Sequence, residues 1–256
     1  MVIKMSQLML LLLRKFQLIK VDTSALFVSD THLSEDSPET INKFNDFLMN
    51  HANKHNFLFI LGDLFEYWIG DDSNQFNTVI NTLKKLKTKI FFIPGNRDFL
   101  IGTDFLKKTN IEPLKDPTLI QLGNKKAIVL HGDTLCTDDK DYQSYRRKVR
   151  SNQWQKEFLD QSIKDRLEIC KDLREQSKKA QENKSETLMD VNENEVKKLF
   201  KKFNYPPIMI HGHTHRPKKH KYKLKDSICE RWVLNDWYDS SSFLFWENNR
   251  LSEKIL

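Results

Sequence analysis

Short apolar runs that end in a polar turn recur along this chain. Residues 58–61 are wholly apolar and are followed by Gly62 and Asp63. A run of this length and composition predicts a strand that is covered on both faces of its sheet. Four other runs follow the same design, and each ends in a turn that carries Asp, Asn or His: residues 25–28, 90–93, 127–130 and 208–210.

Between the first runs, apolar residues recur at helical spacing. Ser37, Pro38 and Glu39 supply a capping hydroxyl, a proline at the first helical position and an acid in the first turn, which together predict a helix start. A second amphipathic helix is predicted from Phe76 to Leu86. Strands that alternate with helices are typical of an α/β fold.

The later runs predict antiparallel pairing. Residues 118–122 and 127–130 flank a turn that contains Gly123 and Asn124, which predicts a hairpin. Residues 232–234 and 243–246 predict closing antiparallel strands.

Residues 133–205 contain neither Gly nor Pro and are rich in Lys, Arg, Glu and Gln. This composition predicts helices. Because the stretch lies between two strands that carry motifs, we expect an inserted helical cap at about residues 138–205. A chain of 256 residues can hold one domain with such an insertion, and we place that domain at residues 23–256.

The amino terminus has a different pattern. Residues 8–13 are apolar and are flanked by Lys4 and Arg14, but the run is shorter than the 20 or so residues of a membrane span. We expect residues 1–22 to be an extension outside the fold, with interfacial membrane contact as the alternative.

Charge widens the choice of partners, and cysteine usage narrows the class of protein. Lys and Arg number 42 against 35 Asp and Glu, a net charge of +7, which favours anionic partners. Nucleic acid, an anionic membrane surface and a phosphorylated substrate all remain open. The three cysteines form no CxxC pair, which argues against a disulfide framework or a zinc ribbon.

The strand ends together supply a set of metal-ligand side chains. On extended backbone, Asp30 and His32 would point the same way and converge on one ion. Asp63 has two carboxylate oxygens and can bridge two ions. A mixed oxygen and nitrogen set without thiolate fits two Mn²⁺, Fe or Zn²⁺ ions, and oxygen ligands favour Mn²⁺. Two such ions lower the pKa of a water between them. The candidate ligands are Asp30, His32, Asp63, Asn96, His131, His213 and His215.

Each candidate also has a simpler interpretation. A single Asp after a strand is most often a turn residue, and His211 could be a hydrogen-bonded core side chain. The joint occurrence of suitable donors at five strand ends favours a metal site.

These motifs carry a resemblance. Asp30-Thr31-His32, Gly62-Asp63, Gly95-Asn96-Arg97-Asp98, His131-Gly132-Asp133 and Gly212-His213-Thr214-His215 resemble the signature of the calcineurin-like metallophosphoesterases. Longer strings around them, such as residues 62–72 and 131–139, resemble one branch, the UDP-2,3-diacylglucosamine diphosphatases of lipid A biosynthesis. The resemblance implies a four-layer α/β/β/α sandwich of two packed sheets flanked by helices, with a helical, lipid-binding cap.

The resemblance also implies roles for individual residues. Asp30, His32, Asp63 and His215 would hold one Mn²⁺, and Asp63, Asn96, His131 and His213 the other. Asp63, Asn96, Arg97 and His213 would be catalytic. Substrate contacts carry over to Asn96, Arg97, Asp139, Tyr142, Arg174, Ser177, Lys184 and His213, and to Gln181, where the family commonly has Asn.

The implied reaction is Mn²⁺-dependent hydrolysis of UDP-2,3-diacylglucosamine. Water would attack the phosphorus on the uridine side and release UMP and 2,3-diacylglucosamine 1-phosphate (lipid X). The implied location is the cytoplasmic face of a Gram-negative inner membrane, as a peripheral protein, and no nucleic-acid partner is expected.

Arg97 supports that reaction by its own chemistry. Arginine stays protonated, so it cannot give a proton to an alkoxide leaving group, but it can neutralise charge on a phosphate. It therefore favours a leaving group that needs no proton, such as a phosphate.

The composition of the cap is also compatible with a lipid substrate. Residues 145–150 and 154–159 interleave basic and apolar side chains, which fits either solvated helix faces or a basic rim with an apolar lining. Two alternatives remain: a nuclease or broad phosphodiesterase on the same scaffold, and a binding protein without activity.

Overall fold

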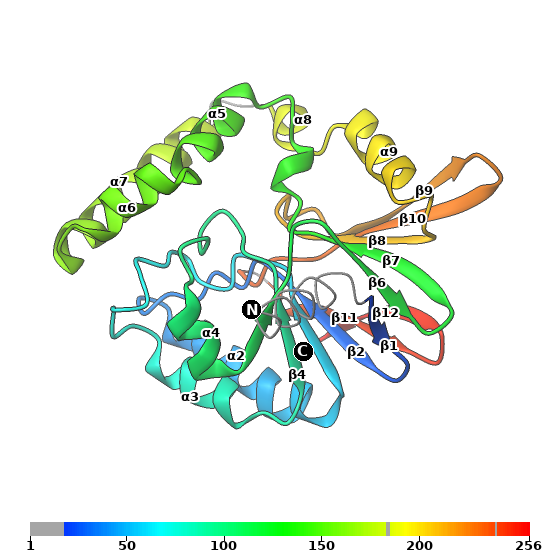
Figure 1. Ribbon diagram of the computed structural model, residues 1–256, viewed down its shortest axis with the longest axis horizontal. Helices are drawn as coiled ribbons and strands as arrows, with labels where there is room; N and C mark the ends of the chain where they lie inside the picture. The colour runs from blue at the N-terminus through cyan, green and yellow to red at the C-terminus, as the bar shows by residue number, and fades with distance from the viewer. Residues whose placement is uncertain (1–17, 183–184, 239) are drawn as a thin grey trace, which may run out of the picture.

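The apolar runs form the centres of two stacked β-sheets in the computed structural model (Figure 1). The structure describes residues 18–182, 185–238 and 240–256. Within them the first sheet has the order β1 (Ile19–Val21), β6 (Thr118–Leu122), β7 (Lys125–Val129), β8 (Ile208–His211), β10 (Ser227–Val233), β9 (Lys218–Leu224). The second has the order β12 (Arg250–Ile255), β11 (Ser242–Glu247), β2 (Ala25–Val28), β3 (Phe57–Ile60), β4 (Lys89–Phe92), β5 (Ile111–Pro113).

Strands β2, β3 and β4 are parallel and apolar on both faces because both faces are covered. Phe27, Phe59 and Phe91 point into the core between the sheets, where their rings stack with centroids 4.9 and 5.0 Å apart. Leu58 and its alternating neighbours point to the other side, into the core under the helices. The predicted two-sided burial is therefore confirmed.

Helices cover the outer faces of both sheets, so the α/β/β/α sandwich is confirmed. On the second sheet these are α2 (Pro38–Asn50), η1 (Ala52–Lys54), α3 (Asn77–Lys85) and α4 (Thr103–Thr109). On the first sheet, Val196 and Phe200 of α9 (Glu193–Lys202) pack against Ile128 and Met209.

The chain between β7 and β8 is mostly helical. After η2 (Asp133–Leu135) come α5 (Lys140–Val149), α6 (Asn152–Leu159), α7 (Ile163–Glu182), α8 (Glu186–Met189) and α9. Figure 1 shows α5, α6 and α7 as an arm above the sheets, with α8 and α9 closer to β8. No helix in the described part of the chain is long and apolar enough to cross a bilayer.

Arg166 ties this arm to the sandwich. Its side chain on α7 is 3% exposed, and its Nη1 donates to the Ile69 carbonyl at 2.6 Å and to Asp72 Oδ1 at 2.8 Å. We expect Arg166→Ala to lower the free energy of unfolding by about 2 kcal/mol, because charge-assisted hydrogen bonds are lost and the Ile69 carbonyl loses its donor. Urea unfolding measures this. Arg147→Ala, at an exposed arginine of α5, is the control, and equal stability of the two variants would contradict the role of Arg166.

Several local predictions are wrong. Residues 19–21 were expected outside the fold, yet they form β1, which pairs in parallel with β6 and buries Val21. The rest of the expected extension, residues 1–17 with the apolar run 8–13, lies outside the described residues. Ser37 precedes α2 but makes no capping hydrogen bond through its side chain. Residues 232–234 close the sheet partly in parallel, since β10 pairs in parallel with β8 and antiparallel with β9.

Candidate metal centre

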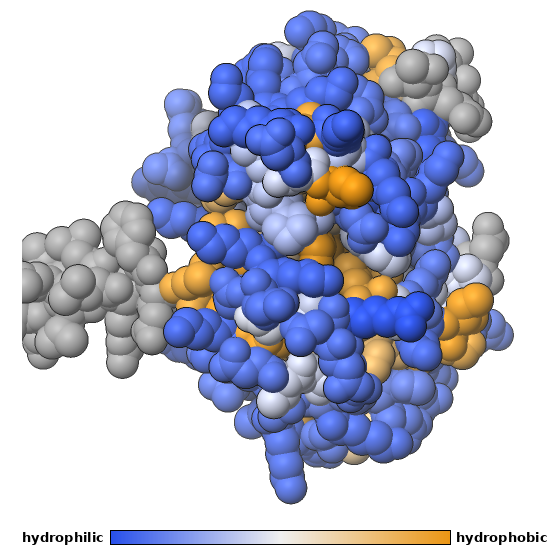
Figure 2. Space-filling model, turned by 90° about the vertical axis from the view of Figure 1, so that its right-hand side faces the viewer, coloured by the Kyte–Doolittle hydropathy of each residue, from blue (hydrophilic) through white to orange (hydrophobic). Residues whose placement is uncertain are grey.

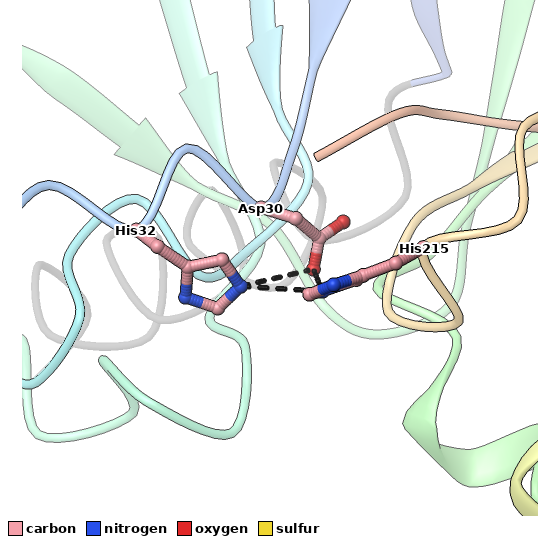
Figure 3. A group of neighbouring side chains, drawn as sticks. All are labelled: Asp30, His32 and His215. Atoms are coloured by element: carbon pink, nitrogen blue, oxygen red, sulfur yellow. Dashed lines mark hydrogen bonds and ion pairs between the residues drawn. The ribbon is translucent and has the colours of Figure 1, made fainter. Parts of the chain in front are cut away.

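Asp30, His32 and His215 point at one another from two different segments of the chain (Figure 3). His32 Nε2 lies 3.2 Å from His215 Nε2, and His215 Nε2 lies 3.4 Å from Asp30 Oδ1. Asp63 adjoins this group, with its Oδ2 3.9 Å from His32 Nε2. These are the four side chains expected to share one ion.

The other three candidates, Asn96, His131 and His213, also meet beside Asp63. Asp63 Oδ2 lies 3.8 Å from His131 Nε2. Asn96 Oδ1 lies 3.0 Å from His131 Nε2 and 2.9 Å from His213 Nδ1. Asp63 Oδ2 is thus close to a histidine nitrogen of each group, and Asp30 also lies within 4.8 Å of His131. The structure brings all seven candidate ligands together.

The backbone reaches this arrangement in a way that the sequence did not predict. Asp30 and His32 are not extended, because both have left-handed backbone conformations that non-glycine residues adopt only at a cost of about 1–3 kcal/mol. Hydrogen bonds from Asp30 N to Gly62 O and from His32 N to Asp63 O, both 3.0 Å, hold these turns. Five of the seven candidates share the feature: Asp30 (φ 52°), His32 (φ 45°), Asp63 (φ 52°), His213 (φ 69°) and His215 (φ 53°).

Two glycines make room for the carboxylates. A Cβ on Gly95 would lie 2.1 Å from Asp63 Oδ1, and one on Gly212 would lie 2.0 Å from Asp30 Oδ2. Any larger residue at either position would displace a candidate ligand, which explains why each motif contains glycine.

The donors fit divalent metal ions. His131 Nδ1 lies 2.9 Å from the Leu61 carbonyl, His32 Nδ1 lies 3.3 Å from Glu66, and His215 Nδ1 lies 3.2 Å from Asp236. These partners orient each ring so that Nε2 faces the cluster, as partners of metal-bound histidines do. Asp30 Oδ1 is buried and accepts no hydrogen bond of good geometry, so a cation would give it a partner.

The electrostatics of the four histidines differ. Burial opposes a charge on His131 and His215, but the carboxylates of Asp63 and Asp30 around His131, and of Asp236 and Asp30 around His215, outweigh it and raise their pKa values to about 9 and about 10. A metal ion would have to displace a proton from each of these two rings.

Burial lowers the pKa of His32 to about 4, and burial with the charge of His131 lowers the pKa of His213 to about 4. Both rings are therefore neutral at neutral pH, the form that ligates metals. Burial opposes a charge on Asp30, but the attraction of His215 and of the other nearby histidines outweighs it and keeps the pKa of that carboxyl well below its usual range.

Sequence reasoning missed the residues that support the candidates. Asp98 accepts hydrogen bonds from Leu64 N at 2.7 Å and from Gly95 N at 2.8 Å, and so holds two motif turns together. Its place in the Gly95–Asp98 motif could have revealed it. Tyr238 stacks on His32 with centroids 5.2 Å apart and donates to Glu66. Neither Asp236 nor Tyr238 carries a sequence signal.

A cavity of about 300 Å³ opens beside the cluster, under the cap helices. Its polar lining includes six residues predicted as substrate contacts: Asn96, Arg97, Asp139, Tyr142, Arg174 and Ser177. Its apolar lining includes Phe99, Leu100, Trp154, Phe158 and Leu173. Arg174 is paired with Glu66. Lys184 lies outside the described residues, and so does the side chain of Gln181.

The expected basic rim on residues 145–150 is wrong in part. Arg146 Nε donates to Asp133 at 2.6 Å, and Arg150 donates to the Gly95 carbonyl at 2.8 Å, so both turn toward the sandwich. Buried acceptors beneath α5 attract these arginines, whereas Arg147 and Lys148 are exposed.

Comparison with known proteins identifies the family. The family model described as calcineurin-like phosphoesterase matches residues 23–217. A UDP-2,3-diacylglucosamine hydrolase of Aromatoleum aromaticum is 45% identical over 88% of this chain and 93% of its own length. Proteins of the same name from Aliivibrio fischeri and Photorhabdus laumondii are 41% and 40% identical, over 86% and 85% of this chain and 92% of each relative. The chain is therefore a hydrolase of the calcineurin-like phosphoesterases and belongs, within them, to the family that includes the UDP-2,3-diacylglucosamine hydrolases.

Proposed function

We propose that the protein hydrolyses the diphosphate of UDP-2,3-diacylglucosamine with two Mn²⁺ ions bound, giving UMP and 2,3-diacylglucosamine 1-phosphate. One observation supports the proposal above all: the cluster of metal-ligand side chains lies beside a cavity beneath the cap, and much of the lining of that cavity is apolar. Such a site offers phosphate chemistry and space for acyl chains side by side. The names of the relatives support the same substrate.

Asp30, His32 and His215 would hold one ion, Asn96, His131 and His213 would hold the other, and Asp63 would contribute to both; the distances between these side chains support this division. The all-oxygen-and-nitrogen set suits Mn²⁺. The bound ions would supply positive charge for the phosphate oxygens and make a water acidic enough to attack at neutral pH.

Arg97 is placed to bind the phosphates. Its backbone N donates to Asp63 Oδ1 at 2.8 Å, its backbone O accepts from Trp68 N, and its side chain lines the cavity. Because a guanidinium stays protonated, it stabilises charge on a phosphate leaving group and does not protonate it. That favours release of a phosphate over release of an alkoxide.

The cap would bind the lipid part of the substrate. Trp154 and Phe158 of α6 stack with centroids 5.0 Å apart and line the cavity together with Phe99. Arg174 and Ser177, one turn apart on α7, place polar groups at the same cavity. The acyl chains would lie against the aromatic part of the cavity, and the phosphates would lie toward Arg97 at its polar part.

The position of water attack tests the reaction. We expect hydrolysis of the lipid nucleotide with Mn²⁺ in ¹⁸O-labelled water to place the label in UMP, since attack occurs on the uridine-side phosphorus. Mass spectrometry of both products measures it, and label in the lipid phosphate would contradict this assignment. Single-stranded DNA incubated in parallel tests the nuclease alternative, which activity on DNA alone would favour.

We also propose that the protein is cytoplasmic and docks on the anionic inner face of the membrane that holds its lipid substrate. Ten Lys and Arg stand against four Asp and Glu in residues 193–230, so this stretch carries most of the net charge of +7. Five exposed lysines of the β9–β10 hairpin belong to it: Lys218, Lys219, Lys221, Lys223 and Lys225. Figure 2 views the molecule from the side on which this hairpin projects, and most of that face is hydrophilic.

Replacing Lys218, Lys221 and Lys223 by Gln should weaken binding to vesicles that contain anionic phospholipid by about a hundredfold, at about 1 kcal/mol for each lysine. Co-sedimentation at low and high salt measures this. The matched control is Lys84, Lys85 and Lys87 to Gln, since these exposed lysines lie on and just after α3. Equal weakening in both triple variants would contradict docking through the hairpin.

A further inference from the structure

His211 ends β8 immediately before the turn that carries His213 and His215. It is fully buried and is not one of the donors of the metal centre. We propose that Arg231 and His211 are positioning residues: Arg231 fixes the tautomer of the His211 ring, and the ring then holds that turn in the form that ligates metal. This inference rests on the proposed metal centre.

The two ring nitrogens of His211 have partners of opposite kinds. His211 Nδ1 lies 2.8 Å from the Gly212 carbonyl oxygen, which can only accept, so Nδ1 must carry the proton. His211 Nε2 lies 3.2 Å from Arg231 Nη1, which can only donate, so Nε2 must be the bare acceptor. The ring is therefore held in one neutral tautomer. The other tautomer is disfavoured, because a proton at Nε2 would point at a guanidinium proton and no hydrogen bond could form.

The Gly212 carbonyl is the point at which this tautomer acts on the turn. It also accepts from Thr214 N at 2.9 Å. The same short segment is hydrogen-bonded to a candidate ligand of each group. Gly212 N donates to the His131 carbonyl at 2.8 Å, and His213 N donates to Asp30 Oδ2 at 2.9 Å. Losing the Nδ1–H donor would leave the Gly212 carbonyl with Thr214 N as its donor and loosen the peptide that aims His213 and His215.

Arg231 is itself fixed from two other elements. Its residue is 1% exposed, its Nε donates to Tyr222 Oη of β9 at 2.9 Å, and its Nη2 lies 3.5 Å from Glu193 Oε1 of α9. Tyr222 Oη also donates to Glu193 at 3.1 Å. A buried charge is expensive compared with an apolar side chain of similar volume, so packing alone does not account for an arginine here. The network links the last helix before β8 to the metal-ligand turn.

Two isosteric pairs of variants separate positioning from packing. In His211→Asn the amide NH₂ can replace the Nδ1–H donor. In His211→Leu the side chain has nearly the same shape as asparagine but carries no donor. In Arg231→Lys a donor remains for His211, whereas Arg231→Met fills the space without one. We expect Leu and Met to weaken Mn²⁺ binding about 10–100-fold, as loss of a supporting partner does at metal sites, with Asn and Lys closer to the wild type. Calorimetry or Mn²⁺ electron paramagnetic resonance, without substrate, measures this.

A second readout needs no metal. Long-range ¹H–¹⁵N NMR of the metal-free protein should show His211 protonated at Nδ1 only in the wild type, with the Nε2–H form appearing in Arg231→Met. Arg231→Met that keeps the single tautomer, or His211→Leu and His211→Asn that bind Mn²⁺ equally, would overturn the proposal. Should one member of a pair fail to fold, the other pair decides between positioning and packing. A wrong substrate would change none of these readouts, and a wild type that binds no Mn²⁺ would overturn the metal centre itself.

Discussion

Asp63→Ala is expected to abolish hydrolysis, with kcat at least about a thousandfold lower, equivalent to about 4 kcal/mol of lost transition-state stabilisation. Asp63 is 2% exposed and lies near donors of both groups, with its Oδ2 3.9 Å from His32 Nε2 and 3.8 Å from His131 Nε2. Removing its carboxylate would take a ligand from both ions at once. Its Oδ1 also holds the backbone of Arg97, so the phosphate-binding turn would loosen too.

Steady-state kinetics and metal analysis of the purified variant test this prediction together. We expect fewer than two Mn²⁺ per chain, along with the lost turnover. Asp46→Ala, at an exposed aspartate on α2, is the control and should keep both ions and full activity. Retained activity in Asp63→Ala would contradict the bridging role.

Arg97→Ala is expected to lower kcat by about 10²–10³-fold, the usual cost of removing one charge-stabilising donor from a transition state. Arg97 lines the cavity together with Asn96, so its charge acts where the phosphates would lie. Arg97→Lys keeps the charge but loses the planar fork, so it should recover only part of the rate.

The pH dependence separates this role from acid catalysis. Since Arg97 gives up no proton, the pH–rate profile of Arg97→Ala should keep the shape of the wild-type profile while its height falls. A profile that loses an ionisation in this variant would show that position 97 transfers a proton, contrary to the proposal.

Local sequence predicted the strands well because their burial leaves a continuous signal. β2, β3 and β4 are covered on both faces, so almost every residue in them is apolar and the runs stand out. The motifs that follow them predicted which side chains would meet, because parallel strands end at a common edge.

Other parts depend on contacts between distant segments. β1 has only three residues and is defined by its pairing with β6, which no local pattern announces. Arg146 and Arg150 resemble a solvated basic face in sequence, but Asp133 and the Gly95 carbonyl lie beneath them in the fold. Asp236 reaches His215 from a segment with no motif. The left-handed turns at Asp30 and His32 were missed because their stabilising partners lie on the neighbouring segment, at Gly62 and Asp63.

Crystals of the wild-type protein grown with Mn²⁺ would show whether Asp63 bridges two metal ions held by the seven donors. With anomalous diffraction recorded above and below the manganese edge, we expect two manganese peaks that both contact the Asp63 carboxylate, one beside His32 and His215 and the other beside His131 and His213. A single peak, or two peaks of which neither touches Asp63, would contradict the bridging by Asp63.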